Sequence, residues 1–459
     1  MDSRESHMTQ TDLFTWSMEH DPALRSTIIS VLILDREPQW DHFWYMVDRG
    51  TRVVPKFRHR LLPLPLGLAP PRWTPDDDFD LAWHVRRILA PPPANLSAVL
   101  EFARTEAMTA FDPVRPLWRI TVMGGLDGDK AALIFKVHHS LTDGIGGIQI
   151  AGEMLDFVRD AAPRPPSGDT TPTVRGGFRD IAAWNWSVGA ELVRAGISTA
   201  LPVARRTMTS PIRTVRDGIA IANSLVRFVR PITSTLSPVM TERGLGRQLS
   251  VLELPTGALH RAARSVGCTM NDAFLTAMLI GFRGYHDKHG AKVEHLRVTM
   301  PISLRTDRDA IGGNRITLAR FALPLDIPDT ADLMRTLDAV VAGWRREPAI
   351  ALSSAIAATF NRLPVGLLTP MFKHVDFIAS DVPGSPVPLY VSGAEVERIY
   401  AFGPTTGTAL NATLISHVGT CYLGINADTA AIPDLPLLTD CLRTGFDTVL
   451  NLAEHLPSS

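Results

Sequence analysis

The run at residues 131–147, AALIFKVHHSLTDGIGG, constrains the fold of this chain more than any other stretch. Its apolar first half is typical of a buried β-strand, and its glycines permit a sharp turn into a following helix. Neighbouring side chains of a strand point to opposite faces, so His138 and His139 cannot both face one cavity. This alternation argues against a metal site shared by the pair. A histidine in an apolar strand is more often a hydrogen-bonded core residue than a catalyst, but a strand-end position before a tight turn also suits catalysis.

Strand and helix patterns alternate on both sides of a segment rich in Pro, Ser, Thr and Gly. A chain of 459 residues is too long for one ordinary core, so two domains are expected. Asp-Gly between the apolar runs around residue 127 predicts a hairpin, and 411–428 predicts another. We therefore expect an α/β protein with an N-terminal domain (9–158), a linker with an Arg-rich helical segment (159–245) and a C-terminal domain (246–459).

Composition excludes several classes of function. The formal net charge of −1 indicates no preference for nucleic acid. The three cysteines lack disulfide or zinc spacing, which favours a reducing, cytoplasmic setting. The longest apolar runs reach only about half the length of about 20 residues that a membrane span needs.

The string HHSLTDG resembles the HHxxxDG signature of the bacterial wax ester synthase/diacylglycerol acyltransferase family, part of the chloramphenicol acetyltransferase-like superfamily. Other stretches are similar to family motifs in the same order: RWTPDDDFDLAWHVRR (72–87), RPLWRI (115–120), TMNDAFLTA (269–277), PISLRTDRDAIGGN (301–314) and ASDVPGSP (379–386). In the last of these, Asp381 stands where the family usually has Asn, and one residue is added before Pro386. We expect these departures to affect loop geometry or substrate fit rather than the chemistry.

The resemblance implies two chloramphenicol acetyltransferase-like domains with mixed sheets and an active-site tunnel at their interface. It implies transfer of a long-chain acyl group from coenzyme A to diacylglycerol or a fatty alcohol, by direct attack without an acyl-enzyme, with no metal and no cofactor beyond the coenzyme A thioester as substrate. His139 would be the general base, since a histidine pKa lies near the operating pH.

The resemblance also implies roles for the other motif residues. Asn271 is the candidate donor for the oxyanion, although Asn271 and Asp272 could merely cap a helix. His138, Asp143, Gly144, Arg305 and Asp272 would be structural at the site, with Arg305 the expected partner of Asp143. Pro116, Trp118, Gly312, Gly313 and Asn314 are candidates for substrate binding, but packing suits the first two and a turn the other three.

Two alternatives remain open at this point: an acyltransferase of polyketide or glycolipid assembly, and a non-catalytic protein that binds lipid surfaces. Residues 175–247 carry eleven Arg and four acidic residues. Such a segment could lie on anionic lipid at an inner membrane or lipid droplet, or form an ordinary solvated face. The histidine pair His286 and His289 is expected at a solvated helix end.

Overall fold

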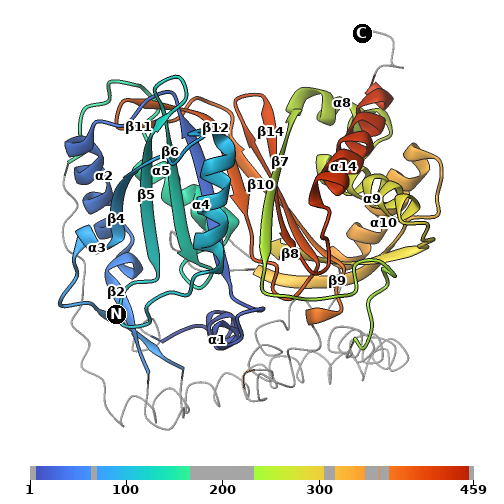
Figure 1. The fold of residues 1–459 in the computed structure, drawn as a ribbon, viewed down its shortest axis with the longest axis horizontal. Helices are drawn as coiled ribbons and strands as arrows, with labels where there is room; N and C mark the ends of the chain where they lie inside the picture. Colours follow the sequence, from blue (N-terminus) through green and yellow to red (C-terminus); the bar gives the residue numbers. More distant parts are fainter. Residues whose placement is uncertain are drawn as a thin grey trace, which may run out of the picture.

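The computed structural model describes residues 7–63, 70–165, 232–303, 316–346, 361 and 372–453. Two mixed sheets stand side by side (Figure 1). The first is six-stranded, with the order β11-β12-β1-β6-β5-β4. Its strands are β11 (Tyr390–Val391), β12 (Ala394–Phe402), β1 (Thr27–Leu34), β6 (Lys130–His138), β5 (Trp118–Leu126) and β4 (Val85–Leu89). All its neighbours pair antiparallel except β4 and β5, which are parallel.

The second sheet is also six-stranded, in the order β7-β14-β13-β10-β8-β9. Its strands are β7 (Arg247–Pro255), β14 (Thr420–Asp428), β13 (Leu410–His417), β10 (Phe377–Ser385), β8 (His295–Ser303) and β9 (Ile316–Pro324). β10 runs parallel to both of its neighbours, and the other pairs are antiparallel. A small separate sheet joins β2 (His59–Leu62) to β3 (Arg72–Pro75).

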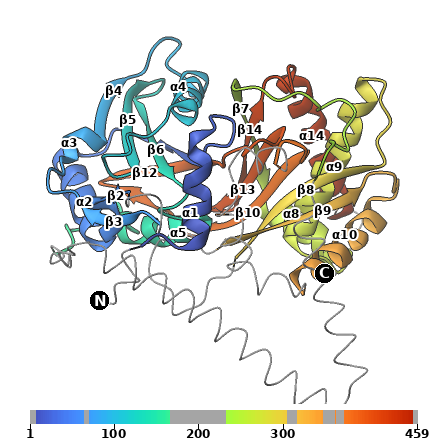
Figure 2. The same cartoon turned by 90° about the horizontal axis from the view of Figure 1, so that it is seen from below.

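Helices pack around both sheets (Figures 1 and 2). Around the first sheet lie α2 (Trp40–Val53), α3 (Leu81–His84), α4 (Leu96–Met108) and α5 (Gly144–Met154), with α1 (Gln10–Ser17) between the halves. The second sheet carries α8 (Thr256–Ser265), α9 (Met270–Lys288), α10 (Thr330–Arg345) and α14 (Leu435–Leu450). Short 3₁₀ turns are η1 (Met18–His20), η2 (Pro55–Arg58) and η4 (Asn451–Ala453). Each half thus buries its own apolar core between sheet and helices.

The local predictions agree with these elements. The Asp-Gly hairpin joins β5 to β6, with Gly128 and Asp129 at positive φ, and the hairpin at 411–428 joins β13 to β14. The helix predicted to follow the glycine-containing turn begins at Gly144, where the Asp143 side chain caps it. His286 is not solvated as expected: it is buried, with its Nε2 2.7 Å from the Ser237 Oγ.

One strand joins the sheet of the first half although the expected domain boundaries assign it to the second half. β11 and β12 fall inside the range 246–459, yet β12 pairs with β1 of the first sheet. Side chains of the second sheet then bond to β12 and the loop after it. His417 Nε2 lies 2.9 Å from the Val396 carbonyl oxygen, and the Tyr422 hydroxyl donates to the Glu397 carbonyl. This strand is therefore shared between the halves.

The close contact between the shared strand and β14 predicts a position where an added side-chain atom would not fit. A Cβ added at Gly424 of β14 would lie 2.1 Å from the Ala401 carbonyl oxygen of β12. We expect Gly424→Ala to lower the free energy of unfolding by about 1–3 kcal/mol or more, because backbone must move to make room. Gly343→Ala, on an exposed turn of α10 with no heavy atom within 4 Å of the added Cβ, is the control and should raise stability by about 0.5–1 kcal/mol. Urea denaturation of both variants checks this, and equal effects would contradict it.

Candidate active site

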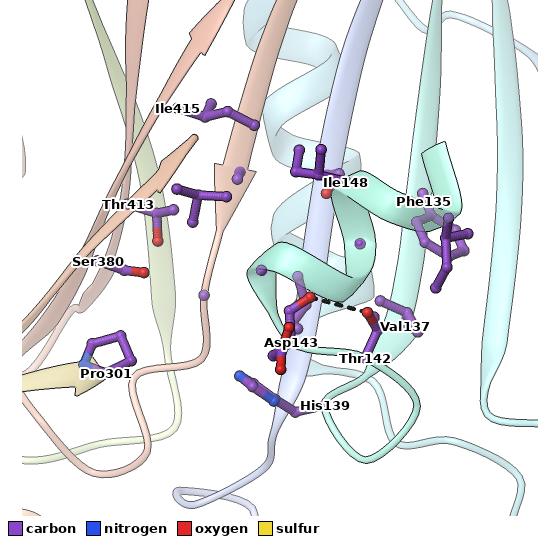
Figure 3. A pocket seen from close by; sticks show the side chains of 18 of the residues that line it. Phe135, Val137, His139, Thr142, Asp143, Ile148, Pro301, Ser380, Thr413 and Ile415 are labelled. Atoms are coloured by element: carbon purple, nitrogen blue, oxygen red, sulfur yellow. Dashed lines mark hydrogen bonds between the residues drawn. The ribbon is translucent and has the colours of Figure 1, made fainter. Parts of the chain in front are cut away.

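His139 follows directly after β6, in the first turn beyond the strand. Its backbone N–H donates to the Ser26 carbonyl, and the chain then turns into α5. The Asp143 side chain caps that helix by accepting from the Gly146 N–H at 2.7 Å, and the Thr142 hydroxyl donates to the Asp143 carbonyl (Figure 3). The imidazole therefore belongs to a short turn whose two ends are held by hydrogen bonds.

The two adjacent histidines lie in different environments, as the strand alternation predicts. His138 is fully buried, with its Nδ1 2.7 Å from the Ser140 Oγ and its Nε2 3.4 Å from the Glu19 carboxylate. Its ring makes T-shaped contacts with the rings of Trp16 and Phe111. Only His139 of the pair lines the large cavity described next.

A cavity of about 570 Å³ lies between the two halves of the molecule. Figure 3 shows His139 and Asp143 on one side of it, facing the strands that carry Pro301, Ser380 and Thr413 on the other. The wall from the first half is largely apolar, whereas the second half adds polar side chains, including Arg320 of β9. Such an interface cavity is the usual place for a ligand site.

Burial controls the charge of His139. It lowers the pKa of the imidazole below its usual value, while the backbone carbonyl of His139 and the Asp143 carboxylate oppose that shift to a smaller extent. His139 is therefore neutral at neutral pH, and a neutral imidazole can accept a proton.

Gly144 lets the histidine turn approach the other half. A Cβ at this position would lie 2.9 Å from the Val382 Cγ2 of β10. Both residues line the cavity, so the absence of a side chain at Gly144 sets the separation of the two walls beside His139.

The cavity lining does not include Asn271 or Asp272, which lie in the first turn of α9. Asp272 and Thr269 form a reciprocal capping box, which is the capping alternative stated above. Asn271 is half-buried, and its Nδ2 has no hydrogen-bond partner in the described part of the chain. The assignment of Asn271 as the oxyanion donor therefore stays a prediction.

Pro116 and Trp118 also lie outside the cavity lining, although both are buried. The Trp118 indole donates to the Phe57 carbonyl at 2.8 Å and stacks on His84 and Phe57. This is the packing role that was the alternative to substrate binding. Arg305, Gly312, Gly313 and Asn314 fall outside the described residues.

The residues of the opposite wall could have been predicted from the sequence, because alternate side chains of a strand share one face. In β10, Ile378, Ser380 and Val382 line the cavity, while Asp381 does not. Asp381 is the position that departs from the family pattern, and its side chain therefore points away from the cavity. Burial raises the pKa of this carboxyl to about 6.

Two further features bear on function. No group of metal-ligating side chains is found in the described ranges. None of the described helices is by itself long and apolar enough to cross a membrane; α8 and α9 meet that criterion only as a pair bent by 94°.

Comparison with known proteins supplies the family. Residues 8–274 match the wax ester synthase/diacylglycerol acyltransferase catalytic domain, and residues 312–449 match the C-terminal domain of the same family. A Mycobacterium tuberculosis H37Rv protein with the provisional name diacylglycerol O-acyltransferase is 33% identical over 445 residues, covering 95% of this chain and 90% of the relative. Another from that strain, with the same provisional name, is 26% identical and covers 93% of this chain and 92% of the relative.

Solved structures share the fold. The wax ester synthase/diacylglycerol acyltransferase of Marinobacter aquaeolei VT8 superposes with a TM-score of 0.66 at 20% identity, covering 98% of this chain and 100% of that one. The first condensation domain of the calcium-dependent antibiotic synthetase gives a TM-score of 0.64 at 16% identity, covering 100% and 98%. The mixed sheets and the two-domain chloramphenicol acetyltransferase-like fold that the sequence predicts are thus confirmed. With both family domains matched in order around a cavity bordered by the HHSLTDG histidine, this chain belongs to the wax ester synthase/diacylglycerol acyltransferase family and is an acyltransferase.

Proposed function

We propose that this acyltransferase moves a long-chain acyl group from coenzyme A to the hydroxyl of diacylglycerol or of a long-chain alcohol, with His139 as the general base. The observation that carries the proposal is a neutral imidazole at the border of a largely apolar cavity between two halves. The family relationship supports the reaction class. A starter condensation domain of rhizomide synthetase with the same fold (TM-score 0.62, 14% identity) has been solved in complex with C8-CoA, which supports a thioester as the donor.

The chemistry follows from the charge state of His139. The imidazole accepts the proton of the acceptor hydroxyl while the oxygen attacks the thioester carbonyl carbon. The tetrahedral intermediate then collapses, the C–S bond breaks, and the imidazolium returns the proton to the leaving thiolate. The ester forms by direct attack, so no covalent acyl-enzyme is needed. Asp143 serves by capping α5 and holding the turn, rather than by relaying charge.

Two alternatives predict different substrates. An acyltransferase of polyketide or glycolipid assembly would prefer a different alcohol, and a non-catalytic lipid-binding protein would release no thiol. A panel of alcohols with palmitoyl-CoA, read by release of free coenzyme A thiol, separates all three.

Removal of the base tests the mechanism. We expect His139→Ala to lower kcat by about 10²–10⁴-fold, because positioned general-base catalysis is typically worth that much. His260→Ala, an exposed histidine on α8, is the matched control and should retain the rate of the unmodified protein. A fully active His139→Ala protein would refute the assignment.

The pH dependence follows from the direction of the His139 pKa. The base works only when neutral, and its pKa is lowered, so activity should persist below pH 6.5 and disappear as pH falls through that lowered pKa. Asp143→Asn removes a charge that raises this pKa but keeps a residue that can cap the helix, so the acid limb of kcat/KM should move to still lower pH. An acid limb above pH 6.5, or one that moves upward in this variant, would contradict the assignment.

Lipid surfaces are the expected source of water-insoluble substrates, and we propose a peripheral membrane or lipid-droplet association through the Arg-rich segment. Most of residues 176–245 fall outside the described residues, so the support is the sequence charge alone.

Reversing that charge tests the association. Changing the arginines of the segment to glutamate should weaken co-sedimentation with anionic liposomes, because each basic residue near such a surface contributes about 1 kcal/mol. An equal number of Arg→Lys changes keeps the charge and serves as the control. Unchanged co-sedimentation of the glutamate variant would remove the idea.

A further inference from the structure

One wall of the cavity is a strip of the first sheet that leads away from His139. On β6, the residues that face the cavity are Val137, Phe135 and Leu133. With a strand rise of about 3.3 Å per residue, Leu133 lies about 20 Å along the strand from His139. On α5, cavity-lining residues recur with helical spacing at Gly144, Gly147, Ile148, Ala151 and Met154, and Ile150 and Gly152 of the same helix also line the cavity. The cavity therefore includes a long slot between a sheet face and a helix.

The pairing of β6, β1 and β12 places the sheet residues that line this slot in rows across the strands. In the middle row, Phe135 pairs with Ser30 of β1, and Ser30 pairs with Ala401 of β12. The row beyond it, farther from His139, contains Leu133, Leu32 and Ile399 in the same registers. The middle row thus has two of the smallest side chains, and the far row has three branched ones.

Burial agrees with this change in size. Ser30, Phe135 and Ala401 are only half-buried although they lie in central strands, whereas Leu32, Leu133 and Ile399 are 9%, 6% and 8% exposed. The free space is therefore deepest over the middle row and becomes shallower at the far row.

The end of the slot is closed by methionine and phenylalanine side chains. Met154 of α5 packs against Gly50 of α2, where an added Cβ would lie 2.8 Å from the Met154 Cγ. Phe43 and Met46 of α2 line the same end. Among the cavity-lining residues of these two rows and the end wall, Ser30 is the one polar side chain, so the slot suits a narrow apolar group rather than a headgroup.

We propose that this slot holds the long unbranched alkyl chain of a substrate, and that the small side chains of Ser30 and Ala401 determine how long a chain the enzyme accepts. The inference rests on the proposed acyl transfer and adds the location of the chain. The chain could come from the acyl thioester or from the acceptor alcohol, and the experiment distinguishes them.

Enlarging the middle row tests the proposal. Ser30→Phe and Ala401→Leu should obstruct the slot about 13 Å along the strand from His139, beyond the reach of a short chain but within that of a long one. We expect the ratio of kcat/KM for palmitoyl-CoA to that for octanoyl-CoA to fall by about tenfold or more, because small differences in an apolar pocket discriminate by about 10–200-fold. Ser30→Ala removes the hydroxyl but keeps the space, so its ratio should match the unmodified protein.

A second arm varies the alcohol from octanol to hexadecanol at fixed octanoyl-CoA. A fall in the long-to-short ratio in this arm alone assigns the slot to the acceptor, and a fall in the first arm alone assigns it to the thioester. Ratios that stay unchanged in both arms, or equal losses for long and short chains, in variants with the melting temperature of the unmodified protein would overturn the proposal. If the bulky variants do not fold, Ser30→Val and Ala401→Val decide by the same ratios.

If the proposed function is wrong, the experiment gives a different result from a failure of the slot proposal. In that case the unmodified protein would transfer no acyl group to any alcohol. Calorimetric binding of palmitoyl-CoA and octanoyl-CoA to the unmodified and Ser30→Phe proteins would then still test the slot. Loss of preference for the longer chain in the variant would support it, and an unchanged preference would reject it.

Discussion

The cavity between the halves depends on β12, the strand that residues of both halves contact. Its backbone pairs with β1, and side chains of β13 and β14 bond to its carbonyl groups and to those of the following loop. Each such hydrogen bond contributes only about 1 kcal/mol net, but leaving a buried partner unsatisfied costs more. Because Ile399 and Ala401 of the same strand face the cavity, the contact between the halves and the shape of the cavity are fixed together.

The cavity is chemically divided by the same arrangement. The first sheet and α5 present an apolar surface, whereas the second sheet presents Asn411, Thr413 and the half-buried Arg320, whose pKa is lowered to about 10 by partial burial. His139 lies at the border between these surfaces. The ester-forming reaction proposed above would need this kind of division, because its substrates combine long apolar chains with a small polar reacting centre.

In the proposed mechanism, burial of His139 is useful because it acts on the charge as well as on position. An exposed imidazole would be partly protonated near neutral pH, and a protonated base cannot accept a proton. The lowered pKa keeps His139 neutral, and the Asp143-capped turn keeps it in place. Two neighbouring residues in the sequence thus have separate roles: His138 packs in the core against Trp16, and His139 borders the cavity.

Features that depend on a few neighbouring residues were predictable from the sequence. The Asp-Gly turn at 127–128, strand alternation and helix capping are local features. The β5–β6 hairpin, the divergence of His138 from His139 and the capping alternative for Asp272 therefore followed from spacing. The HHSLTDG string, through its resemblance to a family, also indicated the reaction class.

Features that depend on long-range pairing were decided only by the tertiary structure. Nothing local indicates that β12 pairs with β1, that Gly144 meets Val382, or that Ser30 lies beside Ala401. Nor could motif order show that Asn271 and Trp118 lie outside the cavity lining. The sequence alone determined which segments become strands, turns and capped helices, because those choices depend on backbone and side-chain preferences within a few residues. The tertiary structure decided which of them meet around His139, because that depends on the packing of segments hundreds of residues apart.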